Sequence, residues 1–536
     1  MRRPELDELA RSEFDLVVIG GGITGAATAR DAALRGLSVL LVEKDDFAAG
    51  TSSRSSKLIH GGLRYLETYQ FTLVAESVRE REALLRLAPH LTEVRPFLYL
   101  LYDGYPESPW LVNLGLTFYD AASGAWRKRR HTMLSAAEVL RREPHLRAEG
   151  LRGAGLYYDV LTDDARLTLD TAQGAAEAGA VLLNHAEVTG LVLEHGRCRG
   201  VTVTDAWTGT TVDVHARQVV SAAGPWTDRV RALEHGRPTG RLRPTKGVHI
   251  VLRKADFPLG TAVFLRSPDD NRVVWPIPSL QDDLVYVGTT DTDYDGDPDD
   301  VRPDPEDIAY LLRVANHAVP GRNLTEEHVV GSWAGLRPLV APDPGTSTSN
   351  TSREHAITTG DTGLIAISGG KLTSNRVMAR QLVDAVMRAL GRPTSRRSLA
   401  AITPVSGALG GAASVRREAE AVGVPDEIAS AWVRRYGSNA HRLVALWRDD
   451  ERNREVIGPR GLTRAEVVHA VRYELAGTLE DVLVRRTSLF FWDDEGGGSG
   501  IDAVADELAG LLGWSEERRA QEVARYRALV AAHRPR

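Results

Sequence analysis

Residues 52–67, SSRSSKLIHGGLRYLE, concentrate residue types that bind polar groups and move protons. Serine hydroxyls and backbone N–H groups donate to phosphate oxygens, and the Gly61–Gly62 pair lets a flat ring approach the backbone. Histidine ordinarily has a pKa near 7, so His60 suits removal of a hydroxyl proton while the carbon gives up a hydride. We predict a cofactor contact followed by a substrate contact. The alternatives are a serine loop without ligand and a histidine that only hydrogen-bonds in the core.

Residues 14–43 must position that stretch, because they read as strand, glycine turn, helix and strand. Gly20, Gly22 and Gly25 form G-x-G-x-x-G, which suits a tight turn, close approach of a pyrophosphate and close helix packing. Glu43 ends the next strand and can accept from ribose hydroxyls. The helix N-terminus attracts phosphate charge. The pattern predicts a dinucleotide site. The alternatives are a tight turn that binds no ligand and a Glu43 that is only a solvated strand end.

The order of the elements favours FAD over a nicotinamide cofactor. The serine run follows the second strand directly, and the chain returns to the sheet only at 218–226, QVVSAAGPW. A nicotinamide dehydrogenase would continue with further βαβ units. We therefore predict an α/β FAD-binding (Rossmann-like) domain with a discontinuous α+β substrate or cap domain and a C-terminal all-α domain.

Several further motifs occur in order along the chain: DDARL at 163–167, AAGPW at 222–226, GTTD at 288–291, GLRPL at 335–339 and GGKLT at 369–373. With the glycine turn and the serine stretch, they resemble the FAD-dependent, aerobic-type glycerol-3-phosphate dehydrogenases among the D-amino-acid-oxidase-like flavoproteins. The resemblance implies oxidation of sn-glycerol 3-phosphate to dihydroxyacetone phosphate, with hydride transfer from C2 to FAD N5. Family relatives pass the electrons to a membrane quinone or, in some cases, to oxygen.

The resemblance also implies the site residues. His60 is the candidate base and Arg337 polarises the reacting oxygen, because arginine is too basic to accept a proton. By resemblance, Arg64 and Arg353 hold the phosphate and Lys371 reaches the phosphate or the flavin edge. Tyr65 and Thr373 are expected as hydrogen-bonding lining of the substrate site, and His249 is a second candidate base or a structural histidine. Arginine suits a phosphate bidentately, although each cation alone can be a surface ion pair.

Cofactor contacts are expected from the glycine turn, the end of the second strand, the serine stretch and two later glycine turns. They are Gly20, Gly22, Ile23, Thr24, Gly25, Glu43, Lys44, Thr51, Ser52, Ser53, Ser55, Ser56, Lys57, Leu58, Gly61, Gly62, Ala223, Gly224, Gly370, Lys371 and Leu372. Lys57 and Leu58 are expected to run beneath the flavin ring. The single cysteine, Cys198, lies away from these motifs, so we predict noncovalent FAD, with a histidyl link left open.

The length of 536 residues predicts several domains. We assign 14–95, 150–240 and 331–394 to the FAD-binding domain, 96–149 and 241–330 to the substrate or cap domain, 395–414 to a linker and 415–536 to the helical domain. The acidic stretch from Asp291 has arginine where a calcium loop needs glutamate, so no metal is predicted. Net charge of −6 gives no pull toward nucleic acid.

Neither a signal peptide nor a spanning segment is apparent, so we expect a cytoplasmic protein, or one attached to the inner face of the cytoplasmic membrane. Residues 109–131 join apolar and aromatic residues to a basic end, which suits anionic lipid or a solvated cap helix equally. Oxygen as acceptor, an oxidase of small amines or amino acids, a vestigial electron-transfer subunit and a homodimer stay open.

Overall fold

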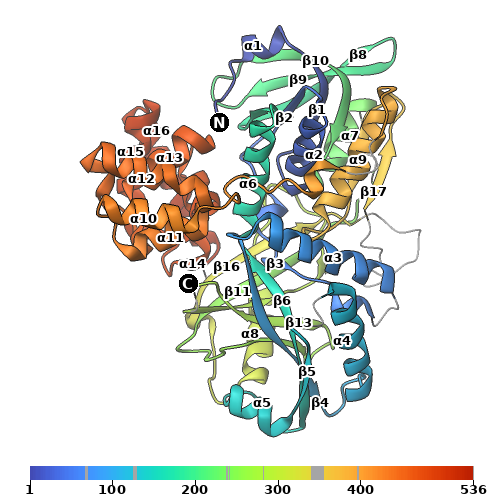
Figure 1. Ribbon diagram of the computed structural model, residues 1–536, viewed down its shortest axis with the longest axis vertical. Helices are drawn as coiled ribbons and strands as arrows, with labels where there is room; N and C mark the ends of the chain where they lie inside the picture. The colour runs from blue at the N-terminus through green and yellow to red at the C-terminus, as the bar shows by residue number, and fades with distance from the viewer. Residues whose placement is uncertain are drawn as a thin grey trace.

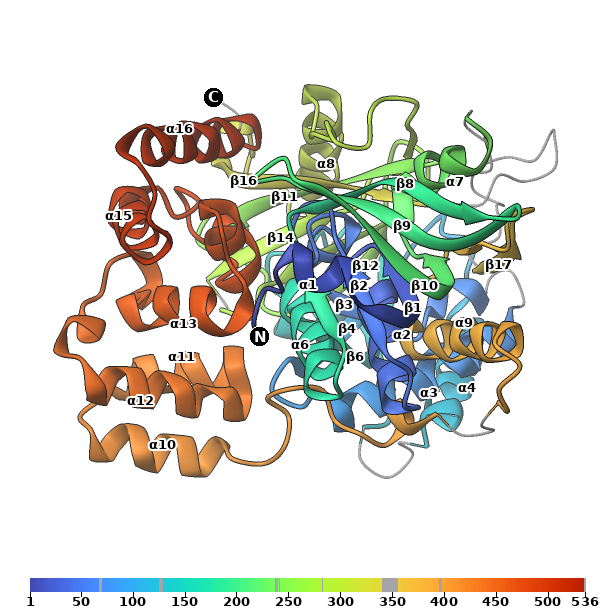
Figure 2. The same ribbon diagram turned by 90° about the horizontal axis from the view of Figure 1, so that it is seen from above.

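The computed structural model describes residues 1–66, 70–124, 129–236, 240, 242–281, 283–339, 355–394 and 398–534. The chain folds into two β-sheets with flanking helices, and the C-terminal helices stand together at one side of both sheets (Figure 1). Figure 2 shows the same group of helices, α10 to α16, beside the sheet region when the molecule is seen from above.

The first sheet has five central parallel strands in the order β18–β10–β1–β2–β7. Strand β17 pairs antiparallel with β18, and β9 with β8 extends antiparallel from β10. The bounds are β1 Glu13–Ile19, β2 Val39–Val42, β7 Val181–Leu183, β8 Ala186–Glu194, β9 Arg197–Asp205, β10 Thr211–Ser221, β17 Ala356–Thr359 and β18 Ile365–Ser368.

Both faces of this sheet are covered, which explains the continuous apolar run of β1. Leu16 and Val18 face a core shared with helices α2, α6 and α9, whereas Val17 and Ile19 face the core under β8 and β9. Alternate residues of a strand point to opposite faces, so a strand buried on both sides must be apolar throughout. The helices are α2 Ile23–Leu34, α6 Asp164–Glu177 and α9 Asn375–Ala389.

The second sheet is mixed, with the order β15–β11–β14–β13–β12–β4–β6–β3, and with β16 beside β11 and β5 beside β6. Its bounds are β3 Leu58–Ile59, β4 Thr92–Tyr102, β5 Thr132–Ser135, β6 Leu151–Thr162, β11 Thr245–Arg253, β12 Ala262–Arg266, β13 Val273–Pro278, β14 Leu284–Gly288, β15 Thr292–Asp293 and β16 Val329–Arg337. Strands β3 and β6 come from segments that the sequence analysis groups with the FAD-binding domain, so the division into domains stays a prediction.

Further helices pack around the two sheets: α1 Leu6–Ala10, α3 Phe71–Leu87, α4 Pro109–Ser123, α5 Ala136–Arg142, α7 Thr227–His235 and α8 Pro305–Ala318. Helices α3 and α4 lie against each other near the β4–β6 end of the second sheet (Figure 1). Within the described ranges, no helix combines the length and apolarity that crossing a bilayer requires.

The C-terminal helices have a core of their own and also share one with the second sheet. Trp432 and Trp447 belong to the separate core, whereas Phe491 and Trp492 pack against Trp333 of β16. The bounds are α10 Ala412–Ala421, α11 Asp426–Tyr436, α12 His441–Asp449, α13 Arg464–Glu474, α14 Leu489–Trp492, α15 Ile501–Leu512 and α16 Glu516–Ala532. This part of the chain is therefore docked on the rest and not merely tethered to it.

Candidate active site

The glycine turn between β1 and α2 needs its glycines for two different reasons. A Cβ at Gly25 would lie 1.8 Å from the carbonyl oxygen of Gly20, and Gly20 itself has φ +105°. These two positions serve the close packing of helix on strand. At Gly22 the nearest atom to an added Cβ is Ser52 Oγ at 3.1 Å. The space at Gly22 is thus left for the approach of a ligand.

A cavity of about 440 Å³ opens at this turn. It is lined by much of the predicted cofactor set: Gly20, Gly22, Ile23, Thr24, Glu43, Lys44, Thr51, Ser52, Ser55, Ala223, Gly224, Gly370, Lys371 and Leu372. The N-terminus of α2 has no side-chain cap, and the Ile23 N–H donates to Ser52 Oγ at 2.9 Å. Bare backbone, an uncapped helix start and serine hydroxyls fit the pyrophosphate of a dinucleotide.

Sequence analysis missed the opposite wall of this cavity. Residues 186–189 of β8 and Trp226 also line it. The Lys44 ammonium lies 4.7 Å from the centre of the Trp226 ring. No local motif marks β8. This strand follows β7 in the chain, and the pairing of β7 with β2 brings it to the cavity.

Glu43 is tied to the glycine turn itself. One carboxylate oxygen accepts from the Gly21 N–H at 2.6 Å, and the other accepts from the Asp45 N–H at 3.0 Å. Burial raises the pKa of Glu43 to about 7, against the lowering effect of these backbone donors. Glu43 therefore shapes the turn as well as lining the wall where a ribose was predicted.

Part of the predicted cofactor set lies outside this cavity: Gly25, Ser53, Ser56, Lys57, Leu58, Gly61 and Gly62. The Lys57 side chain, expected beneath the flavin ring, points into the protein instead. Its ammonium pairs with Asp164 at 2.6 Å, donates to the Ser53 carbonyl at 3.0 Å, and lies 4.0 Å from the centre of the Phe491 ring. The lysine forms a buried ion pair because β3 pairs with β6, and α6, which follows β6, begins at Asp164.

The Gly61–Gly62 pair also has a different local reason from the predicted one. A Cβ at Gly61 would lie 2.5 Å from the Tyr119 hydroxyl, and one at Gly62 would lie 2.5 Å from the Tyr65 ring. The Gly61 N–H donates to the Tyr119 hydroxyl at 2.7 Å. The Tyr119 and Tyr65 side chains occupy the positions next to which a Cβ would lie, so these two protein rings already require glycine here.

One face of the second sheet holds the serine segment in place. The Trp333 indole N–H donates to the Ser55 carbonyl at 3.2 Å, and the Tyr286 hydroxyl donates to the Ser56 carbonyl at 3.1 Å. The Thr51 hydroxyl donates to the carbonyl of Leu336 at 2.7 Å. Strands β14 and β16 thus orient the segment that lines the cofactor cavity.

The same face brings two histidines from distant segments together. Strand register places Trp275, Gly288, His249 and Trp333 in one row across β13, β14, β11 and β16. The His249 ring lies over Gly288, where a Cβ would clash at 2.0 Å. His60 packs edge-on against Trp275, with ring centres 5.5 Å apart. Glycine at position 288 is what leaves room for the His249 ring.

His249 is held as a neutral ring. It stacks on Trp333 at 4.7 Å, and its Nε2 lies 2.9 Å from Ser56 Oγ. Burial, reinforced by the positive charges of Arg337 and Lys57, places the pKa of His249 well below its ordinary value. A neutral imidazole keeps one nitrogen able to accept a proton.

Two buried ring nitrogens in this row, His249 Nδ1 and Trp275 Nε1, have no hydrogen-bond partner among the residues that the structure describes. Buried polar atoms in folded proteins nearly always have partners. These two nitrogens would suit a polar group bound at the row, which agrees with a flavin and substrate end beside the dinucleotide cavity.

His60 has one ring nitrogen already engaged. Its Nδ1 accepts from the Gly62 N–H at 3.1 Å, so the neutral ring carries its proton on Nε2. The Thr373 hydroxyl donates to the His60 carbonyl at 3.3 Å. This tautomer makes His60 Nε2 a hydrogen-bond donor, so a role as base would require the His60 Nδ1 bond to Gly62 to be lost.

Of the four cations predicted at the substrate site, the structure describes the side chains of two, Arg337 and Lys371. Arg337, at the end of β16, pairs with Asp291 at 2.9 Å and donates to Thr289 Oγ1 at 3.1 Å. The Lys371 ammonium lies 3.7 Å from the centre of the Tyr65 ring. The side chain of Arg64 and the whole of Arg353 lie outside the described residues. Asp291 was not predicted as a site residue, although the GTTD motif that contains it was noted.

Comparison with known proteins bears on the whole chain. Residues 15–376 match the family described as FAD dependent oxidoreductase, and residues 398–519 match the C-terminal domain of alpha-glycerophosphate oxidase. The aerobic glycerol-3-phosphate dehydrogenases of Staphylococcus haemolyticus and Bacillus subtilis are each 38% identical to it, covering 95% and 96% of this chain and 93% and 94% of theirs. The chain belongs to the FAD-dependent glycerol-3-phosphate dehydrogenase family.

A solved structure of another family member agrees with this assignment. The glycerol-3-phosphate dehydrogenase from Bacillus halodurans, complexed with FAD, superposes with a TM-score of 0.83 at 32% identity over 98% of this chain and 96% of that one. The predicted family and fold class are confirmed, and FAD is confirmed as the cofactor of the family. L-proline dehydrogenase from P. horikoshii, at 18% identity and a TM-score of 0.54, shares the fold alone.

Proposed function

We propose that this protein oxidises sn-glycerol 3-phosphate to dihydroxyacetone phosphate and passes the electrons to a quinone. The observation that supports it best is the row containing His249 beside Arg337 at the end of a dinucleotide cavity, in a chain that matches glycerol-3-phosphate dehydrogenases over nearly its full length. Bound FAD supplies the chemistry of hydride acceptance.

The side chains divide the remaining work. Arg337, fixed by Asp291 and Thr289, polarises the substrate C2 oxygen, while the His60 Nε2–H donates to the same region. Neutral His249 accepts the hydroxyl proton at Nδ1, because its Nε2 faces Ser56. This assignment moves the role of base from His60, the first candidate, to His249. Arg64, Arg353 and Lys371 are proposed to bind the phosphate.

The test is an anaerobic titration of the FAD-loaded protein, with flavin absorbance followed after each addition. Glycerol 3-phosphate should bleach the flavin, while glycerol, which lacks the phosphate, and sarcosine, a small amine, should not. Bleaching by sarcosine alone would establish an amine oxidase instead. Bleaching by none of the three would indicate a vestigial flavin subunit. Turnover with a quinone analogue and with oxygen, compared at equal substrate, then identifies the acceptor.

The exposed face of α4 supports contact with a membrane, where a quinone resides. Trp110 is 68% exposed, Leu114 56% and Leu111 47%, and Phe71 of the adjacent helix α3 is 47% exposed. Arg129 and Arg130, shortly after α4, are exposed as well. An apolar patch beside basic residues fits an anionic bilayer surface.

Vesicle sedimentation tests this contact. The protein should sediment with vesicles containing phosphatidylglycerol more than with phosphatidylcholine vesicles, and salt should weaken the binding. Trp110→Ser with Leu114→Ser should abolish it, whereas Trp207→Ser, at another partly exposed tryptophan, should leave it unchanged. Equal loss in both variants would remove α4 from the proposal.

A further inference from the structure

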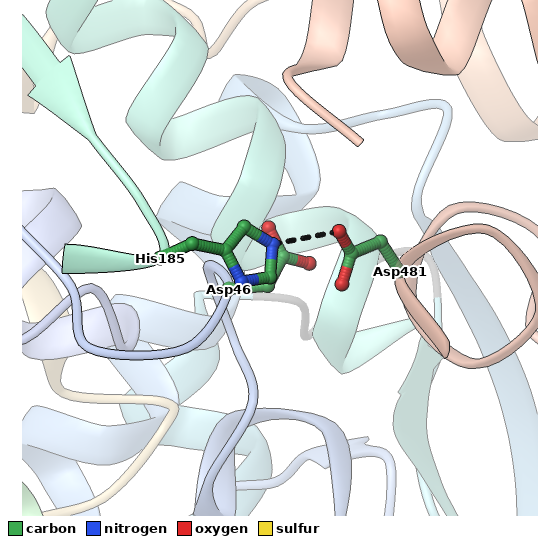
Figure 3. A group of neighbouring side chains, drawn as sticks. All are labelled: Asp46, His185 and Asp481. Carbon is green, nitrogen blue, oxygen red and sulfur yellow. Dashed lines mark hydrogen bonds and ion pairs between the residues drawn. The ribbon is translucent and has the colours of Figure 1, made fainter. Parts of the chain in front are cut away.

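A buried ionic cluster joins the C-terminal helices to the cofactor-binding part of the chain (Figure 3). Asp46 follows Glu43 by three residues, His185 directly precedes the β8 residues of the cavity wall, and Asp481 belongs to the C-terminal helices. His185 Nε2 lies 2.9 Å from the Asp481 carboxylate. The cluster therefore contains residues next in sequence to two parts of the cavity lining, Asp46 beside residues 43–45 and His185 beside residues 186–189.

Asp46 is completely buried and its two oxygens are fully engaged. They accept from Arg485 Nε at 2.7 Å, from Arg486 Nη2 at 2.9 Å and from the Asn184 amide at 3.0 Å. Arg485 also donates to Asp481 at 2.6 Å. Three ligand-type residues, Asp46, His185 and Asp481, stand close enough together for a metal. Because two guanidinium groups already neutralise the two carboxylates, the arrangement is an ion-pair network and not a cation site.

Segment 43–57, which contains Asp46, has a second contact with the C-terminal helices near its other end, at Lys57. The buried Lys57–Asp164 pair is covered by the Phe491 ring of α14, which lies 4.0 Å from the ammonium. Between Asp46 and Lys57 the chain has only one short helical turn, Thr51–Ser53, and no strand. This is the stretch whose residues Thr51, Ser52 and Ser55 line the cofactor cavity.

We propose that the C-terminal helical domain is a positioning element for FAD: Arg485, Arg486 and Phe491 hold segment 43–57 in its FAD-binding shape through Asp46 and Lys57. A segment with little regular structure of its own takes its conformation from its anchors. Loss of one partner of a buried pair leaves an uncompensated charge, which displaces the segment that carries it. FAD binding and docking of the helices are therefore linked, and each strengthens the other.

The test compares Asp46→Asn with Asp170→Asn, the same substitution at an equally buried aspartate. Asp170 of α6 accepts from Arg166 Nη2 at 2.7 Å and lies 2.9 Å from His90 Nε2, and within the part of the chain that the structure describes it has no contact with Arg485, Arg486 or Phe491. Apoprotein is titrated with FAD while quenching of flavin fluorescence is followed, and the melting temperature of each apoprotein is recorded. Asp46→Asn should raise the FAD Kd about tenfold or more, and Asp170→Asn less than about twofold, although both lower the melting temperature.

A second matched pair covers the case in which Asp46→Asn does not fold. Phe491→Leu removes the ring over Lys57, while Phe490→Leu alters its buried neighbour, which packs on His533. Only Phe491→Leu should weaken FAD binding. An unchanged Kd in Asp46→Asn or Phe491→Leu, or an equal rise in variant and control, overturns the proposal. The proposal rests on the proposed function, in which the protein binds FAD. If that were incorrect, the unaltered protein itself would not bind FAD, and the titration would show this directly.

Discussion

The two ends of the candidate site are built in contrasting ways. At the cofactor end, one continuous strand–turn–helix supplies bare backbone and an uncapped helix start, with the serine segment beside it. At the catalytic end, single side chains come from four strands and from the turns near His60 and Lys371, which are about three hundred residues apart. The first end depends on the absence of side chains and the second on their exact partners.

This difference predicts different responses to substitution. A backbone site is sensitive wherever a Cβ cannot fit and tolerant of changes to side chains around it. A side-chain site is sensitive to partners and to protonation. The following predictions probe the contrast, beginning with the largest expected effect.

Gly25→Ala should prevent formation of the cofactor end altogether. The added Cβ would lie 1.8 Å from the Gly20 carbonyl oxygen, and neither backbone can move without separating α2 from β1. We expect little soluble protein and no bound FAD, measured by yield and by flavin absorbance. Gly22→Ala is the control, because its Cβ meets only Ser52 Oγ at 3.1 Å; it should fold and bind FAD more weakly. Full FAD content in Gly25→Ala would show that the turn is not packed as described.

Arg337→Met should damage catalysis without loosening the cofactor. Removing a preorganised donor at a developing charge typically costs about 10²–10³ in kcat. The FAD Kd should be unchanged, because Arg337 does not line the cofactor cavity. Steady-state kinetics and FAD titration measure the two effects separately. Asp291→Asn, which removes only the partner, should give a smaller loss. Equal losses of activity and FAD would mean that the two ends are not separable.

His249 should make the protein less stable in acid. Its folded pKa lies far below the unfolded value of about 6.5, so only the unfolded chain takes up a proton as the pH falls below about 6.5. Stability is therefore lost on acidification below about pH 6.5, at a rate that approaches about 1.4 kcal/mol per pH unit from this residue while its folded form stays neutral. Urea unfolding at pH 7.5 and pH 5 should show a correspondingly smaller fall for His249→Asn. An identical fall in both proteins would show that His249 is protonated in the fold.

Lys44→Met should have the smallest effect. The ammonium is partly exposed and contacts the Trp226 ring and Asp45. Such contacts contribute about 0–1 kcal/mol each, so the FAD Kd should rise by less than about fivefold. A loss comparable to that of Gly25→Ala would contradict a cofactor end built mainly from backbone.

Sequence reasoning was most successful where residues act through local backbone geometry. Gly20, Gly22, Glu43, Ser52 and Ser55 all line one cavity, and their contacts with FAD stay predictions. It did not foresee the partners of the Lys57 side chain, since Asp164 and Phe491 are distant in sequence. It missed β8 and Asp291 for the same reason. The roles of Arg64 and Arg353 stay predictions.

Periodicity and motif spacing by themselves predicted the βαβ start and a helical C-terminus and favoured FAD, because these depend on local spacing and apolar runs. The FAD-dependent family came from the resemblance of the ordered motifs. Only the tertiary structure decided which nitrogen of His60 is engaged, that His249 shares its row, and that the C-terminal helices hold Asp46 and Lys57. Those facts depend on strand register and on the burial of charges, where partners far apart in the chain must meet because an unpaired buried charge is too costly.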